Sequence, residues 1–270
     1  MKITTSKRIV KSLAAVALAV LGATAFAAST WDLVGQCTSN STSQVCGASG
    51  AAISGWSTGT GTVIAPTTGT TFAAATVYNW GAAAGLGVVA INDDPNTSGP
   101  HATDNKYGID ALLVNFTSAP VNLSSLKIGW NGTDNATGTY IDSDLSVLAW
   151  TGGGTPTLAG AGLLSSGWTL IGNYTDVGAS NGSTAGGTQG ISTPIYSSYW
   201  LISAYSTAYG GTLSQFNDAF KILSVAGNTC AGTVTNNSCG SSRVPEPGSV
   251  VLLGVGLVGL MASRRRGQSS

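Results

Sequence analysis

Short runs of apolar and β-branched residues, separated by glycine, asparagine and proline, recur along the middle of the chain. Runs of this length and composition predict β-strands. The residues predicted as strands are 60–64, 76–80, 86–91, 111–116, 121–130, 145–150, 168–174, 199–205 and 220–225. Within 121–130, the period-two alternation predicts that Leu126, Ile128 and Trp130 share one strand face. The positions predicted on the opposite face are Lys127, Gly129 and Asn131.

The composition of residues 28–242 favours an all-β fold. This segment is rich in glycine, serine, threonine, alanine and asparagine and has almost no glutamate, lysine, arginine or methionine, which are good helix formers. We expect a single secreted domain, a β-sandwich of jelly-roll type. Residues 178–190 are predicted as a long surface loop within that domain, because strand-like runs lie on both sides of them.

The first 27 residues have the pattern of a secretory signal peptide. An apolar stretch at 13–21 is followed by Ala25 and Ala27, which form a small-x-small cleavage site. The basic residues before the apolar stretch are Lys2, Lys7, Arg8 and Lys11. The chain is therefore predicted to be exported by the secretion machinery.

The other end of the chain, residues 243–266, combines three features in order. Pro245 and Pro247 hold the backbone extended around Glu246. An apolar segment at 249–263 is short for a spanning helix, which needs about 17 to 25 residues. The basic residues that follow, Arg264, Arg265 and Arg266, predict a cytoplasmic stop, with 267–270 as a cytoplasmic tail.

This ending resembles the PEP-CTERM sorting signal of Gram-negative bacteria, with Val244, Pro245, Glu246 and Pro247 as the matching motif. The resemblance implies processing near the motif by an exosortase, a membrane-embedded cysteine transpeptidase-like enzyme. An ordinary C-terminal anchor would leave the Pro-Glu-Pro sequence unexplained. The predicted route is export across the inner membrane, transient anchoring by the C-terminal helix, and then the cell surface or extracellular matrix.

An interior segment strengthens the expected location and fold. It is similar to the shared block of one group of exosortase-dependent surface proteins, which are secreted and β-rich. The resemblance implies no particular activity. The sequences that carry it are Gly-Leu-Gly-Val-Val-Ala-Ile-Asn at 85–92, Pro-His-Ala-Thr-Asp-Asn at 100–105, Gly-Ile-Asp at 108–110, Ile-Gly-Trp at 128–130 and Ile-Asp-Ser-Asp-Leu at 141–145.

The charge of the exported part differs from the zero net charge of the whole chain. Four of the eleven basic residues lie in the signal peptide and three in the basic stop, so residues 28–244 contain four basic residues and ten aspartates, a formal charge of −6. This balance argues against binding to nucleic acid or to anionic membranes.

Four cysteines occur as two pairs, Cys37 with Cys46 and Cys230 with Cys239, each nine residues apart. In an exported protein cysteines usually form disulfides, and four cysteines allow three connectivities. We prefer local pairing because the repeated spacing would close one loop near each end of the domain. Zinc ligation is the alternative, but the only histidine, His101, is far away in the sequence.

Several acidic and amide residues are candidates for a structural calcium site. Asp142 and Asp144 are two positions apart, so on a strand their carboxylates would lie on one face and repel each other without a cation. Asp104, Asn105 and Asp110 would add oxygen ligands if the fold brings them near. The alternative is that these residues cap turns, as Asp and Asn commonly do.

The residues do not favour catalysis. A serine or cysteine nucleophile needs a base, and His101 is the only imidazole, which we expect to be a hydrogen-bonded loop residue. A glycosidase built on two carboxylates is the alternative, but the domain has no glutamate and nothing marks one carboxyl as the acid. Its candidate residues are Asp104, Asp110, Asp142 and Asp144. We therefore expect a protein that is not an enzyme.

The tryptophans offer two further interpretations. They would fill the core of a domain poor in phenylalanine and methionine, which is the interpretation we favour, or stack on sugar rings if they project outward. The tryptophans concerned are Trp56, Trp80, Trp130, Trp150, Trp168 and Trp200. The predicted function is a non-enzymatic surface or matrix protein sorted by an exosortase. The alternative is a carbohydrate-binding or calcium-dependent adhesion module that contacts extracellular polysaccharide.

Overall fold

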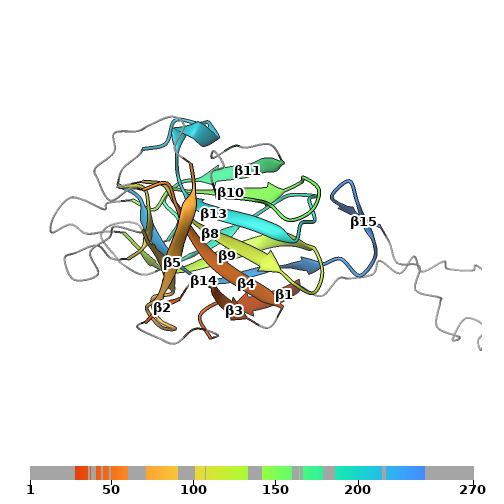
Figure 1. Cartoon of the computed structure of the whole chain (residues 1–270), viewed down its shortest axis with the longest axis horizontal. Helices are drawn as coiled ribbons and strands as arrows, with labels where there is room; N and C mark the ends of the chain where they lie inside the picture. Colours follow the sequence, from red (N-terminus) through yellow and green to blue (C-terminus); the bar gives the residue numbers. More distant parts are fainter. Residues whose placement is uncertain are drawn as a thin grey trace, which may run out of the picture.

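Antiparallel β-strands form almost all of the regular structure in the computed structural model (Figure 1). The structure describes residues 28–35, 37, 50–59, 71–90, 101–106, 108–132, 142–159, 164, 167–178, 186–214 and 217–240, and the backbone alone of 41–43 and 45–48. Within these residues the only helical element is the 3₁₀ helix η1 (Thr207–Tyr209). The expectation of an all-β fold is confirmed.

Strands occur at every predicted run that the structure describes; the run at 60–64 lies outside the described residues. The strand bounds are β1 (Ala28–Asp32), β2 (Ser41–Ser43), β3 (Val45–Ala48), β4 (Ala51–Ser57), β5 (Ala73–Asn79), β6 (Leu86–Val89), β7 (Thr103–Asp104), β8 (Asp110–Phe116), β9 (Val121–Asn131), β10 (Leu145–Trp150), β11 (Trp168–Tyr174), β12 (Thr188–Gly190), β13 (Tyr199–Ala204), β14 (Ala219–Thr229), β15 (Val234–Thr235) and β16 (Ser238–Cys239).

Some strands were missed by the sequence pattern. Small residues dominate β4, so its sequence does not alternate clearly in hydropathy, although its residues alternate strictly between buried and half-buried. β12 lies inside the stretch 178–190 that was predicted as a loop, and it pairs with β9. That prediction is wrong for residues 188–190, because backbone pairing with β9 holds a polar, glycine-containing segment as a strand.

One large sheet runs through the domain in the order β11-β10-β13-β8-β4-β5-β6-β14-β9-β12. β5 connects its two halves, since residues 73–75 pair with β4 and residues 76–79 pair with β6. The sheet bends at β5 into two facing layers and is nearly barrel-like, with β11 and β12 at the ends of the path (Figure 1). The jelly-roll connectivity stays a prediction.

The main core fills the space between the two layers. Ile53 of β4 and Trp200 of β13 come from one layer, while Leu126 of β9 and Phe220 of β14 come from the other, and all are fully buried. A second cluster, which includes Leu113 of β8, covers the opposite face of the first layer. Strands β8, β10 and β13 are therefore buried on both faces, which explains why they read as continuous apolar runs.

A β-bulge at Gly129 determines where Trp130 lies. Trp130 pairs with Lys221, and Ile128 pairs with the next residue of β14, Ile222, so Gly129 is an extra residue on β9. Ile222 belongs to the main core, and Lys221 lies on the other side of the strand, over the ring of Trp130. The prediction that Trp130 shares the core-facing side with Ile128 is wrong, because the bulge reverses the alternation.

A disulfide joins Cys230 to Cys239 across the hairpin β15–β16, with a Cα–Cα distance of 5.5 Å. This is the local pairing preferred for that end of the domain. The hairpin is held to the rest of the domain where the N–H of Tyr196 donates to the carbonyl of Asn237 (2.7 Å). Cys37 also forms a disulfide, and the side chain of Cys46 lies outside the described residues.

The predicted signal peptide (1–27), sorting motif (244–247), membrane segment (249–263), basic stop (264–266) and tail (267–270) all lie outside the described residues. Among the residues that are described, no helix has the length and apolar character needed to cross a membrane.

Replacing Gly129 by alanine is expected to destabilise the domain. A Cβ atom at this position would lie 2.5 Å from the carbonyl oxygen of Ala84 and 2.7 Å from Cγ of Leu223. Overpacking of this kind costs about 1–3 kcal/mol in the free energy of unfolding, measurable by chemical denaturation. Gly190→Ala is the matched control, because no atom lies within 4 Å of its added Cβ. Equal stabilities of the two variants would contradict the structural role of the bulge.

Candidate functional site

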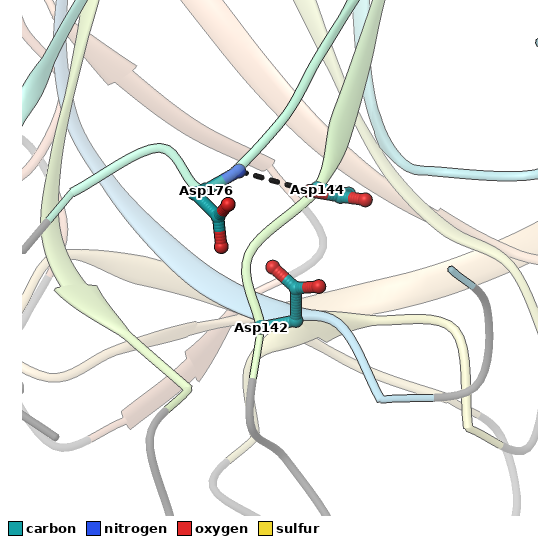
Figure 2. A group of neighbouring side chains, drawn as sticks. All are labelled: Asp142, Asp144 and Asp176. Carbon is teal, nitrogen blue, oxygen red and sulfur yellow. Dashed lines mark hydrogen bonds between the residues drawn. The ribbon is translucent and has the colours of Figure 1, made fainter. Parts of the chain in front are cut away.

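Three carboxylates come together where the segment before β10 meets the segment after β11 (Figure 2). Asp142 and Asp144 precede β10 and Asp176 follows β11, and these strands pair with Leu145 opposite Tyr174. One carboxylate oxygen from each aspartate lies within 4.8 Å of the others. We call these three residues the acidic cluster.

Hydrogen bonds orient each part of the acidic cluster. Asp144 Oδ1 accepts a hydrogen bond from the backbone N–H of Asp176 (2.9 Å) (Figure 2). Asp142 Oδ1 accepts from the N–H of Ser143, and its Oδ2 accepts from the hydroxyl of Ser214, both at 2.8 Å. The donors are neutral groups, so they leave the negative charge of the cluster uncompensated.

Asp218, which is fully buried, connects the acidic cluster to Asn105. Its Oδ1 accepts from the N–H of Asp144 (3.1 Å), and its Oδ2 accepts from the side-chain amide of Asn105. Asn105 Oδ1 accepts from the N–H of Asp218 (3.1 Å), and its amide also donates to the carbonyl of Tyr205 (2.9 Å). This network fixes the start of β14 beside the acidic cluster.

Burial and mutual repulsion raise the pKa values of these carboxyl groups. Burial, followed by the charge of Asp142, raises the pKa of Asp144 to about 6. Burial, followed by the charges of Asp144 and Asp142, raises the pKa of Asp218 to about 8. The pKa of Asp176 is also raised, chiefly by its hydrogen bond with Asp142. None of these causes is a positively charged side chain.

The structure groups the predicted calcium ligands differently from the sequence hypothesis. Asp142 and Asp144 lie together, and Asn105 reaches them only through Asp218. The other two predicted ligands, Asp104 at the end of β7 and Asp110 at the start of β8, lie on either side of a separate turn. There the Asp104 carboxylate accepts from the N–H of Lys106 (3.0 Å), and Asp110 Oδ2 accepts from the N–H of Asp104 (3.5 Å). Asp104 at least caps a turn, as the alternative interpretation expected.

Sequence reasoning missed Asp176 and Asp218. Both are single aspartates far from Asp142 in the chain, and only strand pairing brings them near it. Each lies two residues from the end of a predicted strand, 168–174 or 220–225, which is the one signal that could have pointed to them. Carboxylates arranged in this way suit a hard cation such as Ca²⁺, which takes six to eight oxygen ligands in proteins.

The tryptophans divide between core and surface. Trp200 and Trp168 are buried, and Trp56 and Trp150 pack against the second cluster, so these four follow the favoured interpretation. Trp80 and Trp130 are half-buried and lie outside both main clusters. Trp130 packs instead against the small pair Ala102 and Ala219.

His101 differs from the hydrogen-bonded loop residue that we expected. Its ring lies 5.2 Å from that of Tyr78 and 6.1 Å from that of Trp80, between centroids. Its backbone carbonyl accepts a hydrogen bond from Trp80 Nε1 (3.2 Å). The ring Nδ1 is buried, however, and has no hydrogen-bond partner among the residues that the structure describes.

The C-terminal signal predicted from the sequence is confirmed by comparison with known families. Residues 243–266 match the family model described as the PEP-CTERM protein-sorting motif. The chain therefore carries a PEP-CTERM sorting motif, and such a motif implies exosortase-dependent sorting of an exported protein. No curated protein matches the chain.

The domain is expected to lose stability as the pH rises from about 5 to about 9. Asp144 and Asp218 have higher pKa values in the folded state than their ordinary value of 3.8, so folding favours their protonated forms. This contribution is complete below about pH 4 and is lost as the pH rises through about 6 and then about 8. The expected fall is on the order of a few kcal/mol in chemical denaturation with a chelator present.

Asp218→Asn should make the stability of the domain depend less on pH, because it removes the carboxyl with the higher of the two pKa values. Asp32→Asn is the control, since Asp32 accepts from the N–H of Val34 beside β1, outside the acidic cluster. A stability that rises between pH 5 and 9, or an unchanged profile in Asp218→Asn, would contradict this account.

Proposed function

We propose that this protein is a non-enzymatic surface or extracellular-matrix protein that an exosortase processes at the sorting motif, residues 244–247. The observation that carries this proposal is the PEP-CTERM match at residues 243–266. The predicted signal peptide provides export, and the short apolar segment at 249–263 holds the chain in the membrane until cleavage. A jelly-roll-like β domain with the disulfide Cys230–Cys239 suits an oxidising exterior.

The surroundings of the single histidine support display rather than catalysis. The only imidazole of the chain packs among aromatic rings, and no hydrogen bond joins it to a described serine or cysteine. A general base needs such contact with the group it deprotonates.

The formal charge of −6 on residues 28–244 argues against nucleic acid as a partner. The proposed partners are therefore the exosortase, the secretion machinery and extracellular polysaccharide.

Mass spectrometry of the mature protein tests the processing step. The exported protein should end near residues 244–247 and lack Arg264, Arg265 and Arg266. Glu246→Ala, which removes the single acidic side chain of the motif, should accumulate with the tail attached. Lys127→Ala, at an exposed position on β9, is the control and should be processed normally. Mature protein that still carries the three arginines would reduce the motif to a plain anchor.

The acidic cluster favours a second candidate function, calcium-dependent stabilisation of an adhesion module. Three carboxylate oxygens from two separate segments lie within 4.8 Å, and no positive side chain contributes to the pKa shifts of Asp144 or Asp176. A Ca²⁺ ion held by Asp142, Asp144 and Asp176 would offset their repulsion and join the ends of β10 and β11. Calcium would then control the rigidity of this end of the domain.

Thermal melting during a calcium titration tests this second function. At a Ca²⁺ concentration about 100 times the Kd, binding adds about 2.7 kcal/mol, which raises the Tm of a domain of this size by several degrees. Asp142→Asn should abolish the rise, whereas Asp32→Asn, outside the cluster, should retain it. A Tm unchanged by calcium and by chelator would exclude the cation site.

A further inference from the structure

Lys221 is a buried lysine on the outer face of the sheet, away from the main core. Only 5 % of its surface is exposed, and its Nζ lies 4.1 Å from the ring centroids of both Trp80 and Trp130. We propose that Lys221, Trp80 and Trp130 form a binding site for an acidic saccharide, in which the lysine pairs with the carboxylate of a uronate and the indoles contact its sugar ring.

The backbone builds this arrangement from a β-bulge on β9 and the turn between β5 and β6. The bulge at Gly129 places Trp130 directly opposite Lys221 on the outer face. Trp80 follows β5 in the turn to β6, where its backbone N–H donates to the carbonyl of Gly85 (2.9 Å). β6 in turn pairs with β14 at the residue after Lys221. Both indoles are therefore fixed by strand pairing rather than by a free loop.

The ammonium group of Lys221 lacks an anionic partner. No hydrogen bond or ion pair to its Nζ occurs within the described part of the chain, where its contacts are the two indole rings. Burial lowers the pKa of Lys221 to about 8, so the amine is still mostly protonated at neutral pH. Cation–π contacts contribute about 0.5–2 kcal/mol each but leave the N–H donors without acceptors. A carboxylate would supply those acceptors through charge-assisted hydrogen bonds.

His101 adds a second unsatisfied polar group to the same aromatic cluster. It is 8 % exposed, its ring is stacked with that of Trp80, and its Nδ1 has no partner among the described residues. A buried polar atom without a partner is costly, and in proteins it usually has an explanation such as a functional role, a water or an ion. Because Nδ1 is itself shielded, a saccharide would contact the aromatic cluster at Lys221 and not at this nitrogen.

The chemistry of the site favours a uronate over other ligands. The exposed parts of the half-buried indole rings beside the ammonium group suit the C–H groups of a sugar, and a single lysine suits a single carboxylate. The net negative charge of the domain does not preclude this, because charges beyond about 8 Å are largely screened at physiological ionic strength. The inference rests on the proposed export of the domain, which brings it to extracellular polysaccharide.

Calorimetry on the full chain in a mild detergent tests the site. The probes are oligogalacturonate and oligoglucuronate, each compared with its methyl ester, which keeps the ring and removes the charge. The acid form of one of them should bind at least about tenfold more tightly than its ester, as expected for a hydrogen-bonded charge pair. The proposal would be overturned if neither acid binds, or if each acid that binds does so no more tightly than its ester.

Two variants test whether Lys221 supplies the positive charge that binds the carboxylate. Lys221→Met keeps the apolar stem and should lose the preference for the acid, while Lys127→Met, at an exposed position on β9, should keep it. Retention of the full preference by Lys221→Met would also overturn the proposal. If Lys221→Met does not fold, the comparison of acid and ester on the unaltered protein still decides. Processing of the sorting motif is read by mass, so its failure is distinguishable from failure of saccharide binding.

Discussion

The pairing of β9 with β14 is the constraint on which most of the domain depends. These are the two longest strands, and β14 also pairs with β1, β6 and β7, while β9 carries β12. Their inward side chains, such as Leu126 and Phe220, form one wall of the main core. A shift of one residue in this register would move those side chains to the outer face, so burial of the core specifies the register strongly.

Strand β14 lies beside both candidate sites. Along β9 and β14, the bulge at Gly129 exchanges core and surface positions and places Trp130 beside Lys221. Just before β14, the backbone of Asp142 pairs with residues 217–219, which sets Asp218 against Asp144. Each site carries an electrostatic cost, a buried amine in one and crowded carboxyls in the other, which the apolar core must offset. Ionisable groups with strongly shifted pKa values cluster at the functional sites of proteins.

Much of the fold was predictable because it depends on local patterns. The predicted runs 168–174 and 145–150 coincide with β11 and β10, and the predicted run 111–116 lies within β8. These strands were predictable because strand length and β-branched content are local properties. β4 was missed because its alternation lies between small residues and not between apolar and polar ones. The bulge at Gly129 could not be read from the sequence, because it arises in the pairing of β9 with β14, which is distant in the chain.

The candidate site was predictable only in part, for a similar reason. Asp142 and Asp144 are neighbours in the chain, so their closeness follows from spacing alone, whereas Asp176 and Asp218 join them through tertiary pairing. The sorting motif was predictable in full because it is a linear peptide whose recognition depends on local sequence. The sequence therefore predicted the sorting motif more completely than the candidate sites of the domain.

The central claim is that the domain reaches the exterior only after an exosortase releases it from the membrane. The most direct measurement is a pulse–chase fractionation of producing cells with and without the sorting enzyme. The account predicts that the domain moves from the membrane to the exterior in the first strain and stays in the membrane in the second. Release at the same rate in both strains would contradict it.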